Sequence, residues 1–136
     1  VRAFGVDRST LAKLNRTKAA VQYPQSGTYK AALEVYHHLH CLNYIQMYTF
    51  YDYYSVRNPV MLSETAEERF DHKDHCIDIL RQAIMCRADL NVYTYHWSRE
   101  YSQPVGNLFS HHRCVDWDCF SGWVAGHGPK EPKPEK

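Results

Sequence analysis

The pattern His-x-x-His-Cys occurs twice in this chain, at residues 37–41 and 72–76. On an α-helix, positions i, i+3 and i+4 lie on one face, so each copy places two imidazoles and a thiol on one stripe. Neutral imidazole binds copper, zinc, iron and nickel, and a rigid helix supplies two such ligands with little ordering cost. For a single copy, a hydrogen-bonded polar patch without metal is the alternative interpretation. The duplication favours metal ligation. The predicted ligands are His37, His40, His72 and His75.

Both copies lie in segments that have the sequence features of helices. Apolar residues recur at helical spacing over residues 29–50, which contain no Gly or Pro. Thr65, followed three residues later by Glu68, has the form of a capping box and begins a second such segment. The sequence therefore predicts a mainly α fold, a small helical domain built on two core helices at about 29–50 and 65–88.

The position of the first helix's end decides whether the two histidine pairs can meet. If this helix ran straight to Tyr54 and packed antiparallel to the second, the pairs would lie ~24 Å and ~12 Å from the turn, at 1.5 Å rise per residue. The pairs become level if the helix ends or bends near Tyr48. We therefore predict a break there, with the aromatic residues that follow lying in the connection.

The remaining segments have weaker patterns. Residues 1–28 are predicted to be an extended lead-in with one short helix at 9–20, and residues 29–126 to form a single domain. Within that domain, residues 90–126 show no clean period and are predicted to be irregular, with a short helix around 117–124. Residues 127–136 are predicted to be a disordered tail, because they offer almost no apolar side chain to bury.

Five cysteines without a Cys-x-x-Cys zinc pattern favour a compartment that permits disulfides. Cys41 and Cys76 lie on the histidine stripes, so they are either thiolate ligands or a disulfide that joins the two helices. The disulfide is favoured, because a thiolate beside a redox metal is prone to oxidation. A second disulfide between Cys86 and Cys114 would tie the irregular C-terminal segment to the helices, the alternative being two free thiols. Cys119 has no assigned role.

Charge and other motifs exclude several classes of function. The formal charge of +1, with no run of like charge, makes nucleic acid an unsuitable partner. No Ser-His-Asp spacing, phosphate-binding loop or paired-carboxylate motif supports a hydrolase or a nucleotide-binding protein. His112 is a candidate for one further metal ligand, the alternative being an exposed loop histidine. No catalytic residue is identified. One group of tyrosines is a candidate for a substrate-pocket wall or for carrying an oxidising equivalent, the alternative being core: Tyr44, Tyr48, Tyr51, Tyr53 and Tyr54.

The residues around both motifs resemble the UstYa-like family of fungal secondary-metabolite proteins, which is defined by paired His-x-x-His-Cys motifs. The resemblance covers about residues 25–125, including LEVYHHLHCLNYIQ, HKDHCIDILRQAIMCRADLN and HHRCVDWDCFSGW. It implies a copper-dependent oxidoreductase that uses dioxygen or peroxide to functionalise C–H bonds of a small-molecule or peptide natural product. Cyclisation, hydroxylation, desaturation and halogenation are among the implied outcomes. Gln46, where many relatives have Arg, and Cys119 depart from the family pattern.

The resemblance also implies one or two copper ions on the four motif histidines, and a single-pass membrane protein facing the secretory lumen. The chain opens on Val1 without an apolar leader, so we expect a native membrane anchor to be missing from it. A related subunit or a second copy is a candidate partner. Two rival interpretations are a structural zinc domain and a non-catalytic copper-binding accessory subunit.

Overall fold

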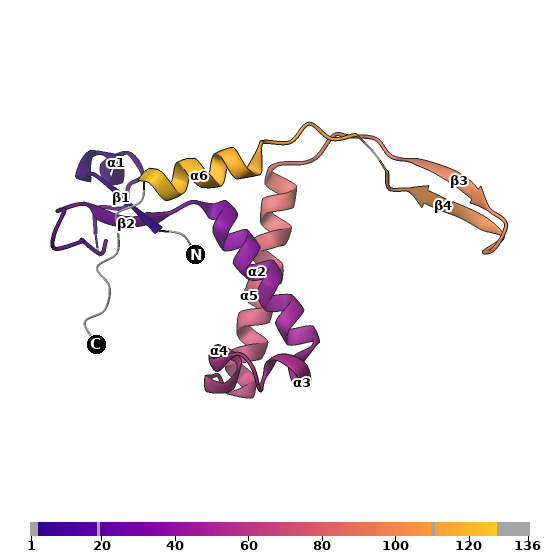
Figure 1. Cartoon of the computed structure of the whole chain (residues 1–136), viewed down its shortest axis with the longest axis horizontal. Helices are drawn as coiled ribbons and strands as arrows, with labels where there is room; N and C mark the ends of the chain where they lie inside the picture. Colours follow the sequence, from indigo (N-terminus) through magenta and orange to yellow (C-terminus); the bar gives the residue numbers. More distant parts are fainter. Residues whose placement is uncertain (1–2, 19, 110, 128–136) are drawn as a thin grey trace.

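The computed structural model describes residues 3–18, 20–109 and 111–127, which contain six helices and two two-stranded sheets (Figure 1). The mainly α prediction is confirmed in this coarse form, and the strands are an addition to it. The predicted disordered tail lies outside the described residues, except for its first residue, His127, which ends a helix.

The two longest helices are α2 (Glu34–Thr49) and α5 (Ala66–Cys86), and they lie side by side at the centre of the molecule (Figure 1). Thr65 caps α5 as predicted: its hydroxyl accepts a hydrogen bond from the Glu68 amide, and the Glu68 carboxylate accepts one from the Thr65 amide. These bonds satisfy amide groups that have no partner within the helix. Each of the two helices carries one copy of the histidine pattern.

The first core helix ends at Thr49, close to the position that lets the two histidine pairs lie at the same height along the packed helices. Phe50 follows the last residue of α2 with φ −109° and ψ 47°, values outside the helical range, and the chain then forms two short helices. These are α3 (Tyr51–Tyr54) and α4 (Pro59–Ser63), and the Asn58 side chain caps the second of them. The predicted break near Tyr48 is therefore confirmed.

A strand replaces the predicted beginning of the first core helix. Residues Tyr29–Ala32 form β2, which pairs antiparallel with β1 (Ala3–Val6), with Ala3 opposite Ala32. The predicted helical start at residue 29 is wrong, because pairing with this distant strand satisfies backbone groups that a helix would otherwise satisfy. Between the strands, α1 (Arg8–Lys13) matches the short helix expected in the lead-in, although it ends earlier.

The segment after α5 is more regular than predicted. Strands β3 (Thr94–Ser98) and β4 (Gln103–Asn107) form an antiparallel hairpin that extends away from the helices (Figure 1). The prediction of irregular structure is wrong over these strands. The short helix predicted around 117–124 is confirmed as α6 (Trp117–His127), which lies on the opposite side of the central helices from the hairpin.

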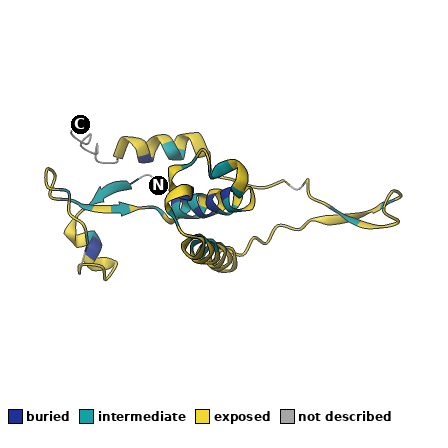
Figure 2. Ribbon diagram, turned by 90° about the horizontal axis from the view of Figure 1, so that it is seen from below, coloured by how far each residue is buried: buried dark blue, intermediate teal, exposed yellow. Residues whose placement is uncertain are grey.

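The buried core is small, and few residues along the ribbon are buried (Figure 2). Its fully or nearly fully buried members come from α2, α4 and α5, whereas most of the hairpin is exposed. Tyr36 extends the packing towards α6 through ring contacts with Trp117 and Phe120. No helix among the described residues is both long and apolar enough to cross a membrane. The core residues are Cys41, Tyr44, Met47, Met61 and Cys76.

Candidate metal centre

The four predicted ligands are brought together by the packing of α2 against α5. The ring centres of His37 and His75 lie 5.7 Å apart, and those of His40 and His72 lie 5.6 Å apart. Within the first motif, the rings of His37 and His40 are 6.5 Å apart. The first histidine of one motif thus faces the second histidine of the other, as antiparallel helices require. The histidine rings that face each other across the two helices are therefore closer together than the two rings of the first motif.

These separations fit metal ligation, although the side chains do not yet converge on one point. Two imidazoles that bind one ion at about 2.0 Å have ring centres roughly 5 Å apart at a tetrahedral angle and about 6 Å apart at wider angles. As the side chains stand in the described part of the chain, no three His, Cys, Asp or Glu residues are placed to hold one ion. The neighbouring rings thus have separations suited to ligand pairs, but a shared site would require the side chains to move from these positions.

In each motif, one histidine has a ring nitrogen within hydrogen-bonding distance of a glutamate carboxylate. The Nδ1 atom of His37 lies 3.3 Å from Oε2 of Glu34, one turn earlier on α2. The Nδ1 atom of His72 lies 3.2 Å from Oε1 of Glu64, which precedes α5. Because an ionised carboxylate only accepts hydrogen bonds, these contacts favour the tautomer with hydrogen on Nδ1, in which Nε2 of a neutral ring offers its lone pair to a metal. Such carboxylate–histidine pairs commonly accompany metal ligands.

The surroundings of His40 lower its pKa and so favour its neutral form. Burial lowers the pKa of His40, and the neighbouring His72 and His37 lower it further because a second positive charge would be repelled. A neutral imidazole retains the lone pair that a metal needs.

The two motif cysteines are completely buried beneath the histidines. Cys41 and Cys76 are free thiols in this structure, and the Cys41 side chain is hydrogen-bonded to Cys76. Burial, followed by this hydrogen bond, raises the pKa of Cys76 to about 12, so a thiolate is disfavoured in the metal-free protein. Their contact is compatible with the predicted disulfide between them, which stays a prediction.

The other predicted site residues lie apart from this cluster. Cys86, Cys114 and Cys119 are exposed free thiols, so no disulfide ties the C-terminal segment to the helices in this structure. His112 is exposed, and its Nδ1 lies 3.0 Å from the amide nitrogen of Asn91. No contact among residues 3–18, 20–109 and 111–127 joins it to the four histidines, so we do not include it among the ligands.

Sequence reasoning missed the two glutamates and the part that Tyr44 plays. Glu64 stands outside both motifs, eight residues before His72, and its role depends on the turn that precedes α5. Tyr44 is fully buried, and its ring centre lies 3.8 Å from that of His72. Glu34 was within reach of sequence reasoning, because it lies three residues before His37 on one helical face.

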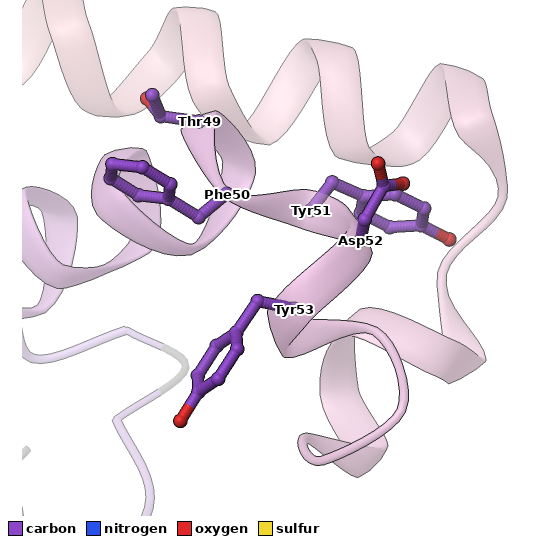
Figure 3. A pocket seen from close by; sticks show the side chains of 5 residues that line it. All are labelled: Thr49, Phe50, Tyr51, Asp52 and Tyr53. Atoms are coloured by element: carbon purple, nitrogen blue, oxygen red, sulfur yellow. The ribbon is translucent and has the colours of Figure 1, made fainter.

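Two hollows lie near the ends of α2. The first, about 310 Å³, is lined by five consecutive residues at the break after α2, where Phe50 and Tyr53 project from the chain (Figure 3). The second, about 330 Å³, lies between the beginning of α2 and α6. Glu34 lines the second hollow and also contacts His37, which connects this hollow to the histidine cluster. The other lining residues are Leu33, Val35, Arg87, Val115, Trp117 and Phe120.

Comparison with known proteins identifies relatives over nearly the whole described chain. The family model described as mycotoxin biosynthesis protein UstYa matches residues 1–127. The UstYa family oxidase aprY of Aspergillus flavus is 32% identical over 98 residues, which cover 70% of this chain and 29% of that protein. The chlorinase cctP2 of Talaromyces islandicus is 31% identical over 123 residues, covering 90% of this chain and 35% of that protein. The transacylase cctO of the same organism is 28% identical over 106 residues, covering 74% and 35%.

The chain spans about a third of the length of these three relatives. The activities in their names differ, so similarity alone does not select a reaction. No solved structure matches the chain.

Proposed function

Since the chain belongs to the UstYa family, we propose that it is a copper-dependent oxidoreductase that functionalises C–H bonds of a fungal natural product. The observation that carries the proposal is the cluster of four imidazoles from two helices, with cross-helix ring separations of 5.7 and 5.6 Å. Histidine-only ligation supports both Cu(I) and Cu(II) and leaves positions open for a co-substrate. The proposal allows one or two ions on these four histidines.

The chain's own residues would hold and orient the metal. His37, His40, His72 and His75 offer ring nitrogens, and the carboxylates on two of these rings direct Nε2 away from the supporting glutamates. Bound copper would supply the one-electron redox chemistry needed with dioxygen or peroxide. The buried core beneath the cluster, including Tyr44, limits side-chain movement on that side of the site.

The hollow between α2 and α6 is the proposed place for the substrate. It is lined mainly by apolar and aromatic side chains, among them Trp117 and Phe120, and it reaches the cluster through Glu34. Glu34 and Arg87 add one charge of each sign to this lining, so an apolar or aromatic natural product with polar groups would suit it. Because Glu34 both lines the hollow and contacts His37, a substrate bound there would lie on the His37 side of the proposed centre.

Metal analysis of the purified chain, followed by electron paramagnetic resonance after copper loading, tests the proposal. We expect a histidine-rich Cu(II) signal and oxygen consumption in the presence of a reductant. Substitutions His40→Ala and His72→Ala each remove a proposed ligand, so copper affinity should fall by more than the roughly 10–100-fold that changes behind the ligands typically cause. His38→Ala is the matched control, because His38 is on the same helix but outside the predicted ligand stripe.

Three outcomes would contradict this function. One tightly bound zinc per chain with no specific copper signal would indicate the structural zinc domain. Specific copper binding without oxygen consumption would indicate the accessory copper-binding subunit. Loss of copper in His38→Ala equal to that in His40→Ala would show that the cluster is not the binding site.

A further inference from the structure

Glu64 follows the last residue of α4 and directly precedes Thr65, the residue that caps α5. Its backbone is extended, with φ −83° and ψ 141°, and its carbonyl oxygen accepts a hydrogen bond from Nη1 of Arg69. The Arg69 guanidinium in turn lies 4.5 Å from the centre of the Tyr51 ring. The main chain at Glu64 is thus held by a side chain of the following helix.

The Glu64 carboxylate bridges a buried core residue and a proposed metal ligand. Its Oε2 accepts a hydrogen bond of 2.5 Å from the Tyr44 hydroxyl, and its Oε1 lies 3.2 Å from Nδ1 of His72. Tyr44 is fully buried, so its hydroxyl has a fixed position, and its ring lies against the His72 ring. Both oxygens of the carboxylate therefore have a partner, and the His72 imidazole is restrained by a hydrogen bond and by a ring contact.

The corresponding pair in the first motif lacks this support. Glu34 contacts His37 over a similar distance, 3.3 Å, but its side chain is 74% exposed, whereas that of Glu64 is 20% exposed. A solvent-exposed pair of this kind holds its geometry weakly, because water competes for both partners. The two motifs look equivalent in sequence, but the structure makes them unequal.

We propose that Glu64 is the positioning residue of the candidate centre: its carboxylate, anchored by Tyr44, fixes the His72 ring with hydrogen on Nδ1 and presents Nε2 to the metal. This inference rests on the proposed metal-binding function, and it adds a residue that neither motif contains. In this proposal the His72 ring is held in its metal-binding orientation before metal binds, whereas the more exposed His37–Glu34 pair can change its orientation. Tyr44 supports His72 in two ways, through the Glu64 carboxylate and by its own ring contact, and it is not a proposed ligand.

The first test observes the metal-free protein. Long-range ¹H–¹⁵N spectra at about pH 8, above the ordinary imidazole pKa near 6.5, report which ring nitrogen of each histidine carries hydrogen. Wild-type His72 should be in the Nδ1–H form. Glu64→Ala should lose this form. Glu64→Gln should keep it, with the amide oxygen accepting from Nδ1 of His72 and the NH2 group donating to the Tyr44 hydroxyl, which can also accept. Glu34→Ala should leave the His72 signals in place.

The second test measures copper affinity by competition with a chelator. Glu64→Ala should weaken binding by about 10–100-fold, the range for residues that orient a ligand, and Glu64→Gln by less than about tenfold. Glu67→Ala is the control for loss of a negative charge near the start of α5, since Glu67 lies in the first turn of that helix, shortly after Glu64. Far-UV circular dichroism of each variant checks that the helices persist, and Glu64→Gln decides if the alanine variant does not fold.

The two tests separate this inference from the function it rests on. An Nδ1–H form of His72 that survives in Glu64→Ala, or copper affinity that is equal in wild type and Glu64→Ala, would overturn the positioning role. A wild-type protein that binds no copper would overturn the proposed function instead. In that case the ring-nitrogen signals still decide whether Glu64 holds His72.

Discussion

At the residue scale, burial distinguishes cysteines that composition treats alike. Cys41 and Cys76 are fully buried between the central helices, whereas Cys86, Cys114 and Cys119 are exposed. Reaction with an alkylating reagent requires an accessible thiolate. The raised pKa of Cys76 and the burial of both motif cysteines work against such a reaction.

We predict that iodoacetamide modifies the native chain at Cys86, Cys114 and Cys119 and spares Cys41 and Cys76. Peptide mapping by mass spectrometry after brief labelling measures the modification at each position. Modification of Cys76 as fast as that of Cys119 would contradict the burial of the motif cysteines.

The same experiment under denaturing conditions tests the predicted Cys41–Cys76 disulfide. If this bond forms in protein made in an oxidising compartment, both residues stay unmodified in denaturant until a reductant is added. Labelling of both in denaturant alone would end the disulfide prediction. The comparison is made on metal-free protein, so that bound copper does not influence the labelling of the thiols.

At the scale of single elements, local signals predicted the helices well. The capping box placed the start of α5 within one residue, and helical periodicity identified most of α2. The beginning of α2 was misplaced because Leu33, its N-cap residue, makes no side-chain capping bond that would mark the boundary. Residues 29–32 carry no clear signal against a helix, and their strand partner is more than twenty residues earlier.

The missed hairpin had a sequence signal of its own. Aromatic side chains alternate at Tyr93, Tyr95 and Trp97, a spacing that favours a strand. The nearby Gly and Pro residues made the segment look irregular. Pro104 is compatible with this hairpin, because each strand has an open edge that needs no further donor.

Loss of the α5 cap should destabilise the chain measurably. Thr65→Ala removes the hydroxyl that accepts the Glu68 amide at 3.2 Å, and the expected cost is about 1 kcal/mol of unfolding free energy. Urea unfolding followed by circular dichroism measures it. Glu67→Ala, in the same helical turn, should change the midpoint much less, and equal midpoints for wild type and Thr65→Ala would contradict the role of the cap.

The cap also has a defined pH dependence. The hydrogen bond from the Thr65 amide lowers the pKa of Glu68. A carboxyl group whose pKa is lowered by folding stabilises the protein at pH values above the pKa that it has in the unfolded chain. This contribution is lost as the pH falls through the lowered pKa of the folded state. The cap therefore contributes fully at neutral pH.

At the scale of the whole molecule, packing is concentrated in one place. The central helices share the core, whereas the hairpin of β3 and β4 projects from them, with exposed aromatic residues such as Trp97 (Figures 1 and 2). A two-stranded hairpin without further packing is at best marginally stable in water. Stability should therefore differ strongly between these two parts.

We predict that backbone amides of residues 94–98 and 103–107 exchange with solvent much faster than those in the middle of α2 and α5. Hydrogen–deuterium exchange followed by mass spectrometry at low protein concentration measures this difference. Protection of the hairpin equal to that of the central helices would contradict its isolation. Adding copper should slow exchange in the central helices and leave the hairpin unchanged.

The sequence by itself determined which histidines share a helical face, where α5 begins and that the first core helix had to stop before Tyr54. These features follow from rise, periodicity and capping, which involve residues within about one turn of each other. Only the tertiary structure decided that His37 faces His75, that β1 pairs with β2 and that Glu64 reaches both Tyr44 and His72. Those contacts join residues brought together by the path of the connecting segments, which no local pattern encodes.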